Sequence, residues 1–224
     1  MGKNNRQVNR LNSHSAVFLP IRAVLFDIGG VFFPWPQSAF FMQWETRLAI
    51  APGHIHQLLW HGPDIEAANI GAITAEEYCC RCAGRLGVDE VQARALIETA
   101  FSGEHLNDEL ATYVWLLHSR VHTAALTNTW SFGRRLIERR GITDLFDLIV
   151  TSAEEGVKKP QARIYEITLE RLDVIAAEAV FIDDTDENVM AARDLGMQSI
   201  LFHSTEQTIA ELEALLAQRG VVHT

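Results

Sequence analysis

The sequence predicts an α/β fold, in which a Rossmann-like doubly wound parallel sheet carries an inserted helical cap. Three observations support this prediction. Five short apolar runs rich in β-favouring residues recur along the chain, and helical patterns separate the last four of them. Between the first two runs, residues 35–105 show helix signals without a convincing strand.

The five apolar runs are the expected strands. Their hydrophobicity is continuous rather than alternating, which suits strands buried on both faces of a parallel sheet. They cover residues 23–29, 122–129, 147–153, 179–185 and 198–203. Strands that alternate with helices form right-handed crossovers, so a doubly wound sheet follows.

Three helices are expected between the last four runs. Residues 132–141 and 187–196 have helical spacing, and they end on Gly141 and Gly196, a residue typical of helix C-termini. Residues 162–173 follow a proline and have the same spacing.

The long segment between the first two runs is the expected cap. Thr74 and Glu77 form a capping box at the start of one helix, and Asp89 opens another. A segment of this length is too long for a simple crossover between parallel strands. We therefore expect a separate group of helices over the carboxyl edge of the sheet.

These elements divide the chain into a core and an insertion. We expect the Rossmann-like core at residues 20–34 and 106–224, with residues 35–105 as the helical cap. The residues before position 20 are polar and Asn-rich and lack the apolar core of a signal peptide. We expect residues 1–19 to form a mobile tail.

The composition limits the class of partner. The 224 residues carry a formal net charge of -10, which argues against a surface for nucleic acid or anionic membranes. No apolar run approaches the ~20 residues that span a bilayer. The sequence therefore predicts no nucleic-acid partner and no membrane partner, and we expect a monomer or a homodimer.

The three cysteines, Cys79, Cys80 and Cys82, lie in one short stretch. A disulfide framework would need more cysteines spread along the chain, so a reducing, cytoplasmic setting is expected. A zinc site is the alternative for this cluster. It would need a second Cys/His pair downstream, so buried thiols are the preferred interpretation.

Acidic and polar side chains follow three of the expected strands. Asp27 ends the first run, Thr127 and Asn128 end the second, and Asp183 and Asp184 end the fourth. In an open parallel sheet the carboxyl ends of strands meet at one edge, where ligands bind near a switch point. The topology should therefore gather these residues.

Two lysines, Lys158 and Lys159, come just after the third run and before Pro160. Each of these polar features has an ordinary explanation on its own, as a helix cap, a turn or a solvated loop. Adjacent acids at the end of an apolar strand are costly unless a cation or hydrogen-bond donors meet them. Together, three carboxylates, a hydroxyl and a lysine are electrostatically balanced only with a divalent cation and an anionic ligand.

The sequence resembles the haloacid dehalogenase superfamily of hydrolases, in the subfamily with a helical cap after the first strand. Four segments in order carry the resemblance: "LFDIGGVF", "LTNT", "GVKKPQARIY" and "FIDDTDENVMAARDLGM". The third segment, together with Gly196 at the helix end in the fourth, resembles the sugar-phosphate phosphatase branch that includes α-glucose-1-phosphate phosphatase. The resemblance implies a Mg²⁺-dependent phosphatase of a small phosphorylated substrate.

The resemblance also implies a role for each residue at the nucleophile and the metal. Asp27 would attack phosphorus and form an aspartyl-phosphate. Mg²⁺ would be held by the Asp27 carboxylate, the main-chain carbonyl of Gly29 and the Asp184 carboxylate. Asp183 would orient water molecules on the metal.

The remaining implied roles concern the phosphoryl group. Thr127 would donate its hydroxyl and Asn128 its backbone amide to phosphoryl oxygens. Lys159, rather than Lys158, would neutralise charge on Asp27 and the transferring group, because Lys159 directly precedes the proline as the lysine of that motif does.

Gly29 departs from the pattern of most phosphatases of this superfamily, which carry a second aspartate there as a general acid and base. Loss of such a group typically costs 10²–10⁴-fold in rate. Two alternatives to a phosphatase therefore stay open. One is a catalytically weak ligand-binding or regulatory protein on the same scaffold. The other is a 2-haloacid dehalogenase, which the acid pair Asp183 and Asp184 disfavours because carbon–halogen displacement needs no metal.

Aromatic and histidine side chains in the cap are candidates for substrate selection. These residues are Trp35, Trp44, Trp60, His54, His56 and His61. Aromatic side chains at helical spacing more often form a packed core than a platform for a sugar. A cap histidine could supply the proton that Gly29 cannot.

Overall fold

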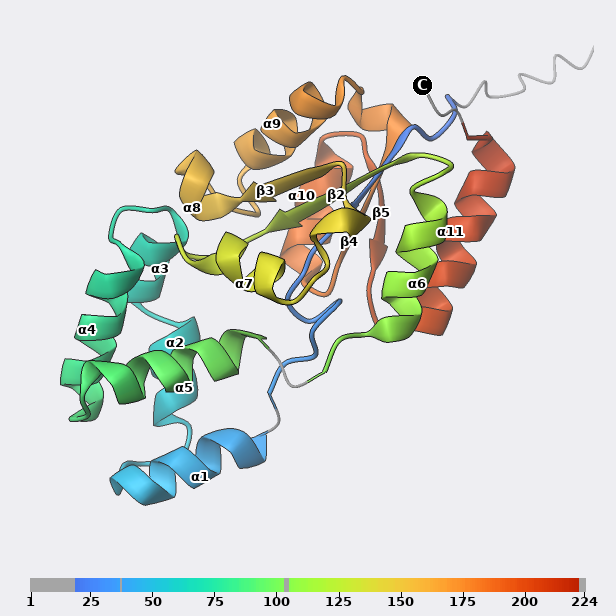
Figure 1. Ribbon diagram of the computed structural model, residues 1–224. Coiled ribbons are helices and arrows are strands. Elements are labelled where there is room, and N and C mark those ends of the chain that lie inside the picture. The colour runs from blue at the N-terminus through green and yellow to red at the C-terminus, as the bar shows by residue number, and fades with distance from the viewer. Residues whose placement is uncertain (1–18, 37, 103–104, 222–224) are drawn as a thin grey trace, which may run out of the picture.

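The computed structural model describes residues 19–36, 38–102 and 105–221. All of the predicted tail except Leu19 lies outside the described residues. The core is one parallel sheet in the strand order β3-β2-β1-β4-β5 (Figure 1). The strands are β1 (Ala23–Phe26), β2 (His122–Thr127), β3 (Leu148–Thr151), β4 (Ala179–Asp183) and β5 (Gln198–Leu201).

The strand order places a switch point beside β1. The chain moves from β1 outward to β2 and β3, then returns to β4 on the other side of β1 and moves outward again to β5. Ala23 is in register with both His122 of β2 and Ala179 of β4. The carboxyl ends of β1, β2 and β4 are therefore neighbours, and ligands of open α/β sheets bind at such a point.

Helices cover both faces of the sheet, and β1 shows why. Val24 and Phe26 belong to one apolar cluster, whereas Ala23 and Leu25 belong to another, because successive side chains of a strand point to opposite faces. On the first face lie α6 (Asp108–Leu117), α7 (Gly133–Arg139) and α11 (Thr205–Arg219); on the second lie α9 (Ala162–Leu172) and α10 (Asp186–Asp194). The short elements are α8 (Ser152–Glu155), η1 (Thr143–Leu145) and η2 (Ala176–Glu178).

Between β1 and β2, the five helices that precede α6 form their own apolar cluster, apart from the two sheet faces (Figure 1). They are α1 (Ser38–Leu48), α2 (His54–Trp60), α3 (Pro63–Asn69), α4 (Ala75–Leu86) and α5 (Glu90–Ser102). The predicted capping box is present, since the Thr74 hydroxyl accepts from Glu77 N and the Glu77 carboxylate accepts from Thr74 N. We refer to α1–α5 as the cap helices.

Several contacts join the cap helices to the core. Trp130, in the loop after β2, is buried in the apolar cluster of the cap helices, with its ring 5.7 Å from that of Tyr78. Gly71 has φ 67°, and a Cβ there would lie 2.3 Å from the carbonyl oxygen of Ala153. The cap helices are therefore packed against the loops at the carboxyl edge of the sheet.

All five predicted strands are present, although each is shorter than its apolar run. The helix α11 was not predicted, although Ser204 and Gln207 form a capping box at its start. The cysteines lie on α4, with Cys79 and Cys82 buried and Cys80 exposed, and all three are free thiols. Within the described residues, the cluster that could hold a metal ion is formed by Asp27, Asp183 and Asp184, away from the cysteines. No described helix is both long and apolar enough to cross a membrane.

Candidate active site

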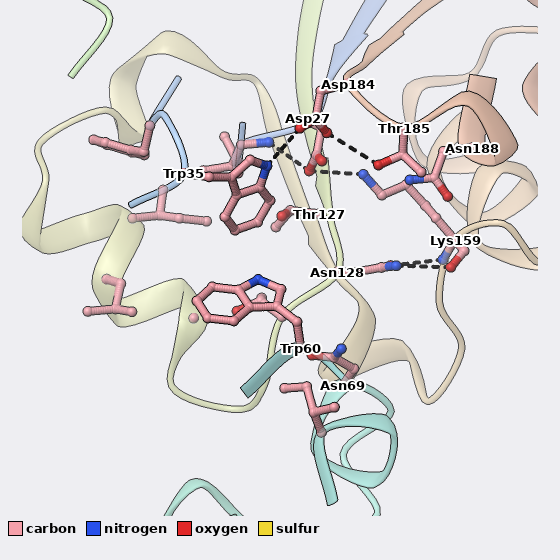
Figure 2. A pocket seen from close by; sticks show the side chains of 18 of the residues that line it. Asp27, Trp35, Trp60, Asn69, Thr127, Asn128, Lys159, Asp184, Thr185 and Asn188 are labelled. Atoms are coloured by element: carbon pink, nitrogen blue, oxygen red, sulfur yellow. Dashed lines mark hydrogen bonds and ion pairs between the residues drawn. The ribbon is translucent and has the colours of Figure 1, made fainter. Parts of the chain in front are cut away.

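The carboxyl ends of β1, β2 and β4 bring the predicted residues to one cavity of about 180 Å³ (Figure 2). Asp27 directly follows β1, Thr127 is the last residue of β2, and Asp184 directly follows β4. Asn128, Lys159 and Gly29 also line this cavity, and so do Trp60, Ile65 and Asn69 from the cap helices. The cavity thus lies between the sheet edge and the cap.

A buried lysine joins two of the acids. The Nζ atom of Lys159 lies 2.9 Å from Oδ1 of Asp27 and 2.6 Å from Oδ2 of Asp183. Burial would lower the pKa of Lys159, but the charges of Asp183 and Asp27 outweigh this effect and raise its pKa above the ordinary value. Lys159 is therefore a cation held by these two carboxylates.

Asp27 is the acid most affected by its surroundings. Burial raises the pKa of Asp27 to about 7; Lys159 opposes this rise, whereas the charges of Asp183 and Asp184 add to it. Three carboxylates share one ammonium group, which leaves the site with an excess of negative charge when all are ionised. A cation would remove this excess and favour the charged form of Asp27.

Asp183 is fully buried and its oxygens are occupied by donors. Besides Lys159, the backbone N–H of Thr185 donates to Oδ1 at 2.8 Å, and Nδ2 of Asn188 lies 3.0 and 3.1 Å from the two carboxylate oxygens. These bonds offset the cost of burying the charge. Asp183 therefore orients Lys159 and the loop after β4, rather than facing the cavity.

Asn128 fixes the backbone of Lys159. Its Nδ2 donates to the Lys159 carbonyl oxygen at 2.9 Å, and its Oδ1 accepts from Lys159 N at 2.8 Å. This reciprocal pair ties the loop after β2 to the loop that carries the buried lysine. The prediction for Asn128 concerned only its backbone amide, so this side-chain role was missed.

Asp184 faces the cavity and receives a hydrogen bond from an indole. Nε1 of Trp35 donates to Oδ2 of Asp184 at 2.8 Å, and the hydroxyl of Thr185 lies 3.3 Å from Oδ1 (Figure 2). Burial raises the pKa of Asp184, and the Trp35 bond opposes that rise. Trp35 was predicted only as a cap aromatic, and its contact with an acid 149 positions away in sequence was not predicted.

The donor set suits Mg²⁺. Oxygen atoms of Asp27, Asp183 and Asp184 all lie within 4.8 Å of one another, and hard oxygen ligands are those that Mg²⁺ prefers. The excess negative charge described above also favours a divalent cation. With Asp183 saturated by its donors, Asp27 and Asp184 are the carboxylates available to such an ion.

The other predicted residues have varied positions around the site. Lys158 forms an ion pair with Glu66 of α3, so it joins the core to the cap helices rather than entering the cavity. Trp60 lines the cavity, and the His56 ring stacks on it with centroids 5.3 Å apart. His54 and His61 line a second cavity, with Asp64 and Arg85. Asn188, which lines the first cavity and holds Asp183, was missed; its position five residues after that acid was the available signal.

Comparison with known proteins finds a family match and structural neighbours. A model of the family described as haloacid dehalogenase-like hydrolase matches residues 116–202, which contain β2 to β5. The solved structure of a predicted HAD-like family hydrolase from Porphyromonas gingivalis superposes with a TM-score of 0.72 at 22% identity, covering 88% of this chain and 98% of that chain. Residues 116–202 therefore match the haloacid dehalogenase-like hydrolases, and the structural neighbour shares the fold of the chain.

A second structural neighbour was solved with ligands. It is a HAD family enzyme from Bacteroides thetaiotaomicron in complex with magnesium and inorganic phosphate, with a TM-score of 0.73 at 18% identity, covering 84% of this chain and 98% of that chain. Identity at this level shows a shared fold. Both neighbours cover more of the chain than the family model matches.

Three curated relatives add detail. The mouse acyl-CoA dehydrogenase family member 10 is 31% identical over 87% of this chain, and pig bifunctional epoxide hydrolase 2 is 28% identical over 87%. This chain spans 19% and 39% of the lengths of these two proteins. A ribulose-1,5-bisphosphate 5-phosphatase from Halopiger xanaduensis is 37% identical over 39% of this chain and 36% of its own length.

Proposed function

We propose that this protein is a Mg²⁺-dependent phosphatase that hydrolyses a small phosphorylated metabolite through an aspartyl-phosphate on Asp27. The observation that carries the proposal is the ion pair of Asp27 with the buried Lys159, beside Asp184 in one cavity. The family and the phosphatase among its curated relatives support it.

The first half of the reaction places a phosphoryl group on Asp27. A carboxylate oxygen of Asp27 forms a bond to phosphorus, and the bond from phosphorus to the ester oxygen breaks. The electron pair leaves with that oxygen, which takes up a proton. Lys159 lies where it can balance the charge on Asp27 and on the phosphoryl oxygens.

Thr127 and Asn128 support this step from the end of β2. Thr127 lines the cavity close to Asp27, so that its hydroxyl can donate to a phosphoryl oxygen (Figure 2). Asn128 fixes the Lys159 backbone, as described above. In the second half, water attacks phosphorus, the bond to Asp27 breaks, and inorganic phosphate leaves with the Asp27 carboxylate regenerated.

Mg²⁺ would be held by Asp27, Asp184 and the main-chain carbonyl of Gly29. When bound, it supplies positive charge that offsets the negative charge of the phosphoryl group. Asp184, fixed by Trp35, presents its carboxylate to this position, while Asp183 keeps Lys159 in place.

The substrate we propose is a small phosphorylated metabolite, with a sugar phosphate as one candidate. The cavity of about 180 Å³ also has to hold the phosphoryl group, so the alcohol part is small. Its walls combine aromatic rings, Trp35 and Trp60, with the polar side chains Asn69 and Arg140. The resemblance to phosphatases of α-glucose 1-phosphate and the ribulose bisphosphate phosphatase relative support a sugar phosphate.

We place this activity in the cytoplasm, in a monomer or homodimer without nucleic-acid or membrane partners. The free thiols of Cys79, Cys80 and Cys82 and the acidic net charge support this setting. One observation favours a second candidate function, a ligand-binding or regulatory protein: the position beside Asp27 that carries an acid in most phosphatases of the superfamily is Gly29.

One experiment tests the proposal against this alternative. The protein is mixed with a panel of phosphate monoesters, with Mg²⁺ or with a chelator, and phosphate release is measured alongside the intact mass of rapidly quenched samples. A phosphatase releases phosphate only with Mg²⁺ and gains the mass of one phosphoryl group, which Asp27→Asn abolishes. Binding of the esters without release or mass gain supports the regulatory function, and halide release from a 2-haloacid supports a dehalogenase.

A further inference from the structure

The indole of Trp35 rests directly on Gly29. A Cβ at position 29 would lie 2.8 Å from Cη2 and 3.2 Å from Cζ2 of this ring. The φ angle of Gly29 is outside the left-handed region that favours glycine, so the backbone alone does not demand glycine there. The space for a side chain at position 29 is instead filled by the ring of Trp35.

The next residue, Gly30, lies beneath the polar edge of the same ring. Its φ is +73°, and a Cβ there would lie 1.9 Å from Oδ2 of Asp184 and 2.6 Å from Nε1 of Trp35. These are the two atoms joined by the 2.8 Å hydrogen bond. The Trp35 ring and its hydrogen bond to Asp184 therefore pack directly against the backbone of two residues that have no side chains.

We propose that Trp35 is a positioning residue that has taken the place of the missing acid. Its ring occupies the space beside Gly29, and its N–H holds Asp184 in the orientation that a metal ligand needs. This inference rests on the proposed phosphatase function. It also explains the pairing of glycine at position 29 with tryptophan at position 35, because any larger side chain at position 29 would collide with the indole.

The geometry has a consequence for the leaving group. Trp35 and Trp60 both line the cavity, and their rings meet edge to face with centroids 5.9 Å apart. The wall beside Gly29 is thus aromatic, and the N–H of Trp35 already donates to Asp184. An ester oxygen that leaves Asp27-bound phosphorus on this side meets no proton donor from Gly29 or Trp35, so esters of acidic alcohols are the substrates that this wall suits.

Metal binding tests the positioning role without turnover. Isothermal titration with Mg²⁺ compares the wild type with Trp35→Phe, which keeps a ring but loses the N–H. Loss of a group that orients a metal ligand typically costs 10–100-fold in metal affinity, so we expect about a tenfold weaker Kd. Trp60→Phe, in the same cavity but without the bond to Asp184, is the matched control and should change the Kd by less than about twofold. Equal affinity of Trp35→Phe and the wild type would overturn the positioning role while leaving the phosphatase proposal intact.

A double-mutant cycle tests whether Trp35 fills the acid's place. Gly29→Asp alone should lower the melting temperature, because the new side chain meets the indole. In the Trp35→Ala background, Gly29→Asp should cost little melting temperature, because the indole is no longer there. The double variant should also form the aspartyl-phosphate at a rate that depends less on leaving-group pKa. Independent effects of the two substitutions would show that Trp35 does not occupy this space. A wild type that binds no Mg²⁺ and gains no phosphoryl group would instead overturn the proposed function and this inference together.

Discussion

Nζ of Lys159 lies 2.9 Å from Oδ1 of Asp27, and the Lys159 side chain is 1% exposed. A lysine buried to this extent needs fixed partners, and its ammonium group has them in Asp27 and Asp183. The side chain of Asn128 also holds the Lys159 backbone through hydrogen bonds. Lys158, the next residue toward the N-terminus, turns away and pairs with Glu66 of the cap helices. The two adjacent lysines therefore have different roles, and substitutions distinguish them.

Lys159→Met should reduce the rate of aspartyl-phosphate formation strongly. Removal of one preorganised group at a reacting centre costs about 2.7–4 kcal/mol in transition-state stabilisation. Lys158→Met is the matched control, and it should leave kcat nearly unchanged, since its partner is in the cap helices. Single-turnover kinetics with one phosphate ester measures both. Equal losses in the two variants, or a larger loss for Lys158→Met, would contradict the assignment.

Asp27→Asn should abolish phosphorylation and yet stabilise the metal-free protein. Burial raises the pKa of Asp27 to about 7 from an ordinary value of 3.8, so the folded state favours the protonated form. The cost of ionising Asp27 therefore grows as pH rises from 3.8 to about 7 and is fully present above that range. At pH 8 in a chelator, the melting temperature should rise by about 2–4 °C for each kcal/mol of repulsion relieved.

The Mg²⁺ response of the same variant supplies the control. Mg²⁺ should raise the melting temperature of the wild type more than that of Asp27→Asn, because the ion offsets a charge that the variant lacks. A fall in the melting temperature of metal-free Asp27→Asn would mean that its ion pair with Lys159 outweighs burial and the repulsion from Asp183 and Asp184.

A third prediction concerns the cap helices. The Asp64 carboxylate of α3 accepts a hydrogen bond from Nη1 of Arg81 at 2.9 Å, and its Oδ2 lies 2.7 Å from Nη2 of Arg85. Both arginines are on α4. The hydrogen bond from Arg81 and the charge of Arg85 lower the pKa of Asp64 below 3.8 despite burial. The ionised Asp64 therefore stabilises the folded state above pH 3.8, and this contribution is lost as pH falls through the lowered pKa of Asp64.

Asp64→Asn should thus lower the melting temperature at pH 7, and the difference from the wild type should shrink as the solution is acidified below pH 3.8. Thermal melts at several pH values measure this. Glu76→Gln is the control on α4, since Glu76 is exposed and lies 3.8 Å from its partner Arg94. A difference between wild type and Asp64→Asn that is constant with pH would show that the charge of Asp64 contributes nothing.

Much of the fold could be predicted because apolar runs and helix end signals are local. The Thr74–Glu77 capping box, and Gly141 and Gly196 after α7 and α10, are read from a few adjacent residues. The gathering of Asp27, Thr127 and Asp184 at one edge follows from the parallel sheet itself. The bond between Trp35 and Asp184 could not be predicted, because it depends on how a loop beside the cap folds back over two glycines.

Two misses had local signals. The Ser204–Gln207 capping box precedes α11, and it is of the same type as the box recognised at Thr74. Asn188 is the third residue of α10, and its side chain reaches back to Asp183. The side-chain role of Asn128 is different, because its partner is the backbone of a residue 31 positions away, and no local pattern reports such a contact.

The last prediction concerns the leaving group, whose proton cannot come from position 29. Aryl phosphates leave as weakly basic phenolates and hardly need a proton, whereas alkyl phosphates need one. A sugar 1-phosphate lies between them, because an anomeric hydroxyl is more acidic than an ordinary alcohol. The rate of Asp27 phosphorylation should therefore fall steeply as leaving-group pKa rises, and anomeric phosphates should react faster than primary sugar phosphates. Single-turnover kinetics over a series of esters measures the slope. A flat slope would mean that another group already supplies the proton; His56, stacked on Trp60 of the cavity wall, would be the residue to substitute next.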